Sequence, residues 1–148
     1  MQFDDFIQKV QEQTRLATRE ESIVITRAVL ETLGERLDRK VRNGVEAQLP
    51  KELKDFLLAR VESADQYELA EFYNRVAARA DLKHQNGIER TRQVLSVLRQ
   101  AIARGEIRDI LESLPASMKN YLNTNHLARH NDKHILRIGW VVDCLSLN

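Results

Sequence analysis

The sequence has one cysteine, Cys144, in 148 residues, and only two prolines and five glycines. A single thiol cannot form an internal disulfide or a cysteine-rich zinc site, so the chain suits a reducing compartment and we expect a cytoplasmic location. The low proline and glycine content disfavours a turn-rich β-sandwich, a collagen-like chain and a low-complexity linker.

Long apolar runs are also missing. The most apolar stretch, Ile135 to Leu147, contains Arg137 and Asp143 and is shorter than the roughly 17 to 25 residues that cross a bilayer. The first ten residues, MQFDDFIQKV, lack the basic region and the apolar core of a secretory signal. We therefore expect neither a secretion signal nor a membrane span.

Neither sign of charge dominates. Lys and Arg number 23 against 22 Asp and Glu, and the net charge of +1 gives no overall field for nucleic acid or an anionic membrane. The most basic stretch, Arg36 to Arg42, lies close to Glu35 and Glu46 and has no aromatic residues between its charges. This pattern favours a solvated face over contact with nucleic acid.

An internal repeat organises the chain. Residues 26–33, TRAVLETL, align with residues 91–98, TRQVLSVL, and the register continues to a Leu-Pro step at 49–50 and again at 114–115. The sequence therefore predicts one all-α domain over 1–148, a helical bundle of two tandem pseudo-symmetric repeats. Repeat one covers 3–58, repeat two covers 68–122, residues 60–66 join them, and a C-terminal extension covers 123–148.

Each repeat is expected to contain several helices. Thr18 with Glu21 resembles a capping box, in which the threonine oxygen and the glutamate satisfy free amides at the start of a helix. Pro50 and Pro115 are expected to occupy the first position of a short helix, where proline fits well. The long helix of each repeat is expected to bury one apolar stripe, formed by Ile23, Thr26, Leu30, Leu33 and Leu37 in repeat one and by Ile88, Thr91, Leu95, Leu98 and Ile102 in repeat two.

Several segments of both predicted repeats together resemble a known protein family. The runs FDDFIQKVQEQTRL, TRAVLETLGERL and AQLPKELKDFLL, followed by FYNRVAARADL and RTRQVLSVLRQAIARGEIRDILESLP, resemble the bacterial family catalogued as domain of unknown function 2267. The resemblance covers roughly residues 2 to 122 and implies a small all-helical protein. The family has no established activity, so it implies no catalytic residues. Asp81 stands where the family pattern leads us to expect a glycine.

Three histidines, His126, His130 and His134, recur every four residues in the extension. On a helix each adjacent pair would share one face and suit a transition metal. All three cannot bind one ion on a straight helix, because the outer two would be roughly 12 Å apart. The surrounding asparagines favour a solvated linker over a metal site.

The acidic side chains of the sequence show no pattern typical of a catalytic site. Glu31 and Glu35 lie one helical turn apart, with Arg27 and Arg36 within reach, and this predicts a solvated ion-pair face. The sequence has no pair of Glu-x-x-His motifs, no glycine-rich phosphate loop and no nucleophile elbow. We therefore expect no catalytic residues, no cofactor and no enzymatic activity.

The end of the chain is the strongest candidate for contact with a partner. It holds the only tryptophan, Trp140, in an apolar segment that is costly to leave in water. A helix and a strand both fit its pattern, and it could dock on its own bundle or exchange with a second chain. The candidate contact residues are Ile135, Ile138, Trp140, Val142 and Leu145.

Two functional hypotheses follow. The first is a non-catalytic helical interaction or scaffold protein with a protein partner, and one form of this hypothesis is a homodimer formed through the tail. The alternative is a regulatory protein that binds a small ligand in the groove between the repeats, or a metal at His126, His130 and His134.

Overall fold

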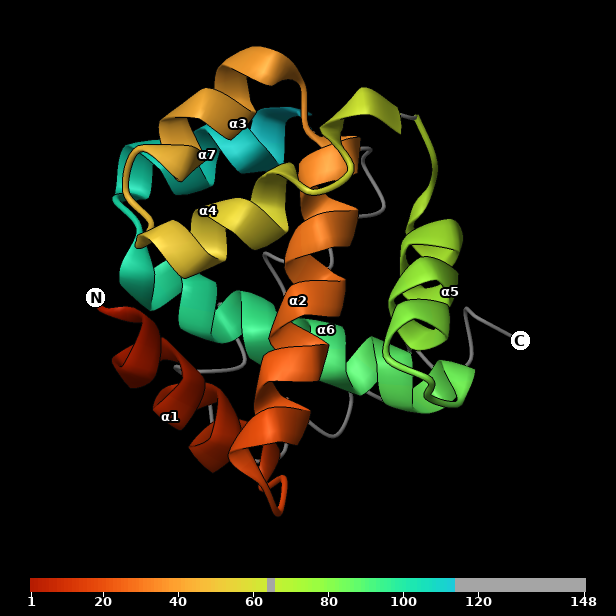
Figure 1. The fold of residues 1–148 in the computed structure, drawn as a ribbon. Coiled ribbons are helices and arrows are strands. Elements are labelled where there is room, and N and C mark those ends of the chain that lie inside the picture. The colour runs from red at the N-terminus through yellow and green to blue at the C-terminus, as the bar shows by residue number, and fades with distance from the viewer. Residues whose placement is uncertain (64–65, 114–148) are drawn as a thin grey trace, which may run out of the picture.

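The computed structural model describes residues 1–63 and 66–113, and this part of the chain is all-α. It contains seven α-helices and one short 3-10 turn, with no strand among the described residues (Figure 1). The all-α prediction is therefore confirmed. The helices are α1 (Phe3–Thr14), α2 (Arg19–Arg36), α3 (Arg39–Glu46), α4 (Lys51–Leu58), α5 (Leu69–Arg79), α6 (His84–Ala101) and α7 (Arg104–Ser113), and the 3-10 turn η1 is Val61–Ser63.

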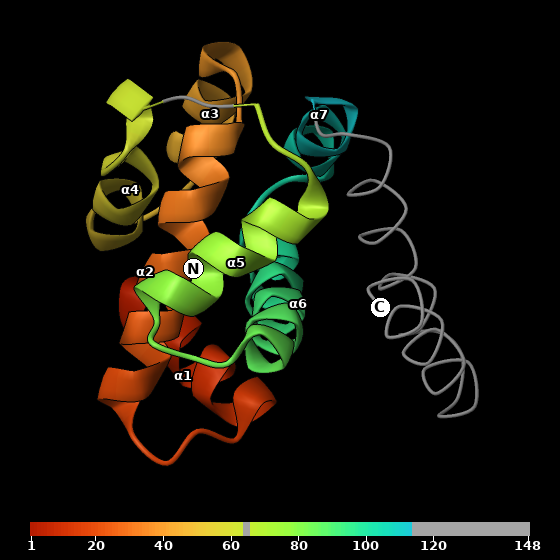
Figure 2. The same cartoon turned by 90° about the vertical axis from the view of Figure 1, so that its right-hand side faces the viewer.

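Helix α2 is the centre of the fold. It packs against α1, α4, α5 and α6, and Figure 1 shows it crossing α6, with α1 and α4 on one side and α5 on the other. In the view turned by 90° (Figure 2), α6 and α7 lie on the side of α2 opposite α4. The remaining two helices, α3 and α7, pack against each other.

The stripe predicted for α2 is buried, and the helix buries more than this stripe. Thr26, Leu30 and Leu33 are buried as expected, and so are Ile25 and Val29, which lie outside the predicted stripe. The physical reason is that neighbouring helices cover α2 from several directions, so an apolar residue on almost any face finds a partner. Beyond the exposed first turn, Arg19 to Glu21, only Val24 and Arg27 of α2 are exposed, and they continue a narrow line that starts at Glu20.

One hydrophobic cluster runs through both predicted repeats, and it includes Phe6 and Leu30 from the first and Val94 and Leu98 from the second. The long helices α2 and α6 have 18 residues each, and they follow helices of 12 and 11 residues. The order of helix lengths thus recurs along the chain. The residue-by-residue repeat and the division into 3–58, 68–122 and 123–148 stay predictions.

Local sequence signals begin several helices. The backbone N–H of Glu21 donates to Thr18 Oγ1 at 3.1 Å, which confirms the predicted threonine cap. Asp38 caps α3 in the same way by accepting from the N–H of Val41 at 3.0 Å. Pro50 lies one residue before α4 rather than in its first position, because its extended ψ of 161° belongs to a capping residue.

Two turns adopt a left-handed backbone. Arg15, after α1, has φ 57°, and Asp81, after α5, has φ 55°. The N–H of Leu82 donates to the carbonyl of Ala77 at 2.8 Å, the long hydrogen bond of a Schellman motif. Glycine is the residue best suited to this conformation, which gives a physical reason for the glycine expected at position 81.

Helices α2 and α4 approach closely at Gly34. A Cβ added at this buried position would overlap the backbone carbonyl of Leu57. Backbone cannot move aside as a flexible side chain can, so hydrogen is the only side chain that this packing admits. Gly34 therefore fixes the distance between the two helices.

We predict that Gly34→Ala lowers the free energy of unfolding by at least about 2 kcal/mol, the cost of overpacking a tight contact. Gly105→Ala is the matched control, because a Cβ at that helical glycine meets nothing within 4 Å. The control should keep or raise stability. Urea denaturation of both variants measures the difference, and equal stabilities would contradict the close approach.

We also predict that Asp81→Gly stabilises the fold by about 0.5 to 1 kcal/mol, since glycine adopts the left-handed backbone without a Cβ clash. Asp81→Ala keeps the Cβ and should give no gain. Thermal melting of the three proteins tests this ranking. An alanine variant as stable as the glycine variant would show that left-handed strain is not the cause.

Candidate functional site

The residues that the sequence singled out for binding are not placed by the structure. The candidate metal ligands His126, His130 and His134 lie outside the described residues, as do the tail contacts Ile135, Ile138, Trp140, Val142 and Leu145. Within 1–63 and 66–113, no group of three or more His, Cys, Asp or Glu side chains is positioned to hold a metal ion. In the same ranges, every helix is too short or too polar to span a bilayer.

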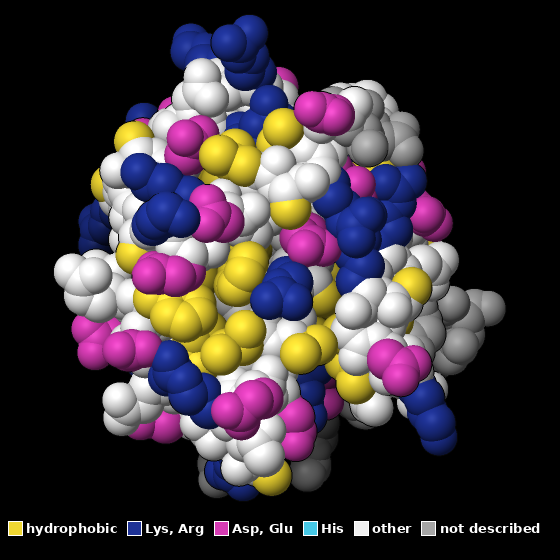
Figure 3. All heavy atoms as spheres, viewed as in Figure 1, with side chains coloured by type: hydrophobic (Ala, Val, Ile, Leu, Met, Phe, Trp, Pro, Cys, Tyr) yellow, Lys and Arg dark blue, Asp and Glu magenta, His cyan; other side chains and the backbone are white. Residues whose placement is uncertain are grey.

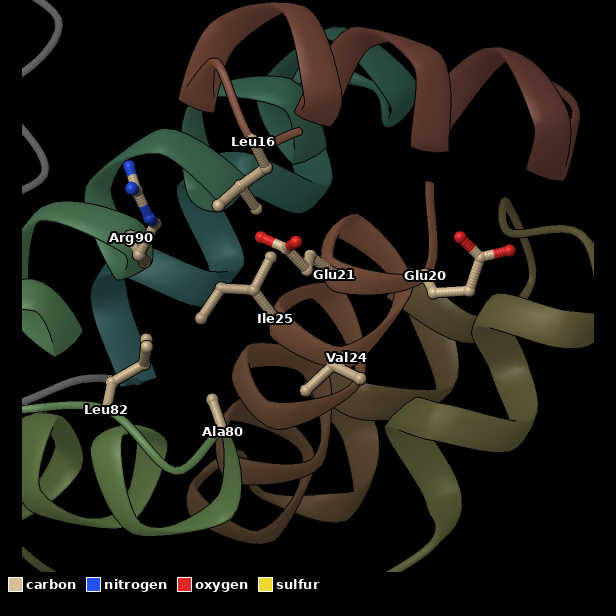
Figure 4. A pocket seen from close by; sticks show the side chains of 8 residues that line it. All are labelled: Leu16, Glu20, Glu21, Val24, Ile25, Ala80, Leu82 and Arg90. Atoms are coloured by element: carbon tan, nitrogen blue, oxygen red, sulfur yellow. The ribbon is translucent and has the colours of Figure 1, made fainter. Parts of the chain in front are cut away.

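The described residues contain a groove between the segments predicted as the two repeats, for which the sequence named no lining residues. It lies where the α1–α2 turn meets the α5–α6 turn, and its volume is about 230 Å³ (Figure 4). In Figure 4 the side chains of Leu16, Ile25 and Leu82 surround the same gap. The full lining is Leu16, Glu20, Glu21, Val24, Ile25, Ala80, Leu82 and Arg90.

The two left-handed turns build this groove. Each turn reverses the chain directly after a helix, at Arg15 and at Asp81, and the next residue in each case is a leucine of the groove lining. Val24 adds an apolar side chain from α2 and is 43% exposed, one of only two large apolar side chains so exposed in the described part of the chain. The site is therefore an apolar depression that is open to solvent.

Charges border the apolar floor. Glu20 and Glu21 lie in the first turn of α2, where the helix dipole favours carboxylates, and both are exposed. Neither carboxylate forms an ion pair within the described ranges. On the α6 side, Arg90 donates to the carbonyl of Thr14 at 3.3 Å and to Gln93 Oε1 at 2.8 Å. These bonds fix the arginine at the groove edge.

A second hollow, about 450 Å³, lies between α3 and α7 and is more polar. Its acidic side chains are Asp38, Glu106, Asp109 and Glu112, with Lys40 beside them. Asp38 is already engaged as the cap of α3. The carboxylate of Glu106 lies close to Gly44, where a Cβ would overlap it. This contact is one of those that pack α7 against α3.

A buried ionic network attaches α5 to α2, and it overturns the solvated face predicted for Glu35. The Glu35 side chain is only 2% exposed. Its Oε1 lies 2.9 Å from a guanidinium nitrogen of Arg75 and 2.9 Å from one of Arg79. Arg79 also donates to Thr32 Oγ1 at 2.8 Å, so the network reaches one turn along α2.

The segment before α5 completes the network. The hydroxyl of Tyr67 donates to the carbonyl of Thr32 at 2.6 Å and lies 3.3 Å from Glu35 Oε1. Arg36, also predicted to be solvated, is buried, and its Nε donates to the carbonyl of Tyr67 at 3.0 Å. The guanidinium of Arg75 lies 4.0 Å from the centre of the Tyr67 ring, a cation–π contact.

The network holds α5 against α2. Glu35 accepts from two arginines that hold it in place, and removing either partner of such a buried pair is strongly destabilising. Burial raises the pKa of the Tyr67 hydroxyl, and the negative charge of Glu35 raises it further. Tyr67 therefore stays protonated and keeps its hydrogen bond.

Glu31, the other acid of the predicted face, forms an ion pair with Arg60 at 3.0 Å. Arg27 is exposed and lies over the ring of Phe56, with its guanidinium carbon 5.0 Å from the ring centre. The predicted pairing of these acids with Arg27 and Arg36 is therefore wrong. The arginines that neutralise Glu31 and Glu35 come from segments distant in the sequence, and spacing along one helix does not reveal such partners.

The surface near α1, α2 and α4 mixes apolar and charged groups. Figure 3 shows hydrophobic side chains gathered where these helices meet, bordered by charges of both signs. The rings of Phe3 and Phe56 contact edge to face at 6.2 Å. Arg19 lies over Phe3 and Arg27 over Phe56. The cationic side chains thus already cover part of this apolar surface.

The raised pKa of Tyr67 generates a pH prediction. A proton held more tightly in the folded state stabilises it below the unfolded pKa of about 10, and this stabilisation is lost as pH rises. Above pH 10 the unfolding free energy of the wild type should fall by up to about 1.4 kcal/mol per pH unit more than that of Tyr67→Phe. Below pH 10 the variant should be about 1 to 2 kcal/mol less stable. Urea titrations across pH 8 to 11.5 measure both, and parallel curves would contradict the buried hydroxyl.

A family model matches most of the chain. A family described as "Uncharacterized conserved protein (DUF2267)" matches residues 3–121. No curated protein matches the chain. The family match contains the groove and the buried network and ends before the extension at 123–148. Because it spans most of the sequence, the chain belongs to the DUF2267 family of uncharacterised conserved proteins.

Proposed function

We propose that the chain is a non-catalytic helical interaction protein whose groove accepts an apolar side chain of a protein partner. The observation that carries this proposal is the groove itself, an apolar depression with Val24 exposed beside it and, at its edge, carboxylates that form no ion pair with any described residue. The single cysteine supports a cytoplasmic place for the interaction.

The groove volume favours a side chain over a small molecule. Pockets for small ligands usually have volumes of roughly 300 to 1,000 Å³ and enclose most of the ligand. The volume here is about 230 Å³, and one side is open to solvent. One or two apolar side chains of a partner fit these dimensions better than a cofactor-sized molecule, which favours the interaction hypothesis over ligand-dependent regulation.

The charges indicate what the partner presents. The edge formed by Glu20 and Glu21 favours a basic residue near the apolar anchor, because two exposed carboxylates lie beside the floor. Arg90 on the α6 side favours an acidic group at the other edge. We infer a partner segment with an apolar anchor and charges of both signs.

We predict that Val24→Asp abolishes partner binding and leaves the fold intact, since Val24 is already 43% exposed. Loss of an apolar contact of about 1.5 kcal/mol, with a carboxylate added against the partner, corresponds to at least tenfold weaker binding. Ala70→Asp is the matched control, because Ala70 is exposed in the first turn of α5, at the end opposite the groove.

The measurement is affinity capture from the source cell with the immobilised full chain, quantified by mass spectrometry. Proteins retained by the wild type and by Ala70→Asp should be depleted at least tenfold with Val24→Asp. Circular dichroism melts should show that both variants fold. Equal recovery of the same proteins with Val24→Asp would contradict the groove as the binding site.

A further inference from the structure

The groove needs an occupant with two chemical properties. Its floor consists of Leu16, Val24, Ile25, Ala80 and Leu82. The carboxylates at its edge, Glu20 and Glu21, form no ion pair with any residue of 1–63 or 66–113. An apolar segment that also carries a positive charge satisfies both the floor and the edge.

The chain itself contains such a segment. Residues 135–145, ILRIGWVVDCL, hold the only tryptophan and are apolar except for Arg137 and Asp143. Arg137 complements the carboxylates of Glu20 and Glu21, and Asp143 complements Arg90 on the opposite side of the groove. The family match ends at residue 121, so this segment lies outside the matched region.

Length permits contact within one chain. The 22 steps from residue 113 to residue 135 span up to about 70 Å when extended. A fold of this size has a radius of gyration of about 13 Å, so the segment can reach any point of the surface. A tether of this kind gives a local concentration near the millimolar range, which favours the same chain over a second copy at ordinary protein concentrations.

We propose that residues 135–145 dock in the groove of their own chain, with Trp140 on the apolar floor and Arg137 beside Glu20 and Glu21. This inference rests on the proposed function, because it requires that the groove accept an apolar side chain. The tail then competes with the partner for one site. Partner affinity is reduced by the fraction of molecules whose groove the tail occupies, which makes the tail an internal inhibitor.

Trp140 reports its own environment, because it is the only tryptophan of the full chain. The wild type should show emission at shorter wavelength than the urea-denatured chain, and weaker quenching by acrylamide. Val24→Asp should shift both signals to the denatured values, while Ala70→Asp leaves them unchanged. The shielding should persist on dilution, and light scattering should give the mass of a monomer.

A charge exchange tests the predicted orientation. Glu21→Lys should expose Trp140, and combining it with Arg137→Glu should restore the shielding, because the two charges are then reversed together. Glu52→Lys is the control, since Glu52 also lies in the first turn of a helix, α4, away from the groove. Failure of the double variant to restore the shielding would overturn the proposed orientation.

Three results would overturn the docking itself. The first is a Trp140 that is as accessible in the wild type as in the denatured chain. The second is unchanged Trp140 emission in Val24→Asp, and the third is loss of the shielding on dilution, as expected when a dimer dissociates. The capture experiment is independent of these. Undiminished partner recovery with Val24→Asp contradicts the proposed function, whereas an unmoved Trp140 signal contradicts tail docking whatever proteins are captured.

Discussion

The fold depends on the burial of α2 among α1, α4, α5 and α6. A central helix packs against a different neighbour on each side, so its sequence needs a different type of side chain at each contact. Gly34 removes a side chain where α4 approaches, and Glu35, the next residue, supplies a charge where α5 packs. Apolar residues such as Leu30 and Leu33 fill the rest. Steric and electrostatic constraints on α2 thus set the positions of the helices around it.

The geometry of the groove depends on how α5 is held against α2. Arg75 and Arg79 bind Glu35 and hold α5 against α2, and α5 runs directly into the turn that carries Ala80 and Leu82. The ionic network therefore positions this side of the groove, because it holds α5 in place. Replacing a buried ion pair with apolar residues often preserves stability, so its value here lies in fixing one relative placement of α5 and α2.

Local signals in the sequence predicted much of the fold. The threonine cap at Thr18, the helix after Pro50 and the all-α class all follow from spacing and capping over a few residues. The burial of Glu35 and the groove beside Leu16 depend instead on segments 40 to 70 residues apart, which periodicity along one helix does not encode. The sequence did contain one signal for the burial of Glu35. Arg75 and Arg79 lie one turn apart on α5, and such a pair of arginines can surround a buried acid from another segment.

The narrow exposed line on α2 separates its surface positions from its packing positions. Glu20, Val24 and Arg27 are positions at which this central helix meets water, and two of them line the groove. Substitutions at the buried positions of α2 disturb packing on one side or another, whereas substitutions along this line alter the surface and spare the core. The chemistry of this surface can therefore vary at these few positions, while the helix that organises the fold stays the same.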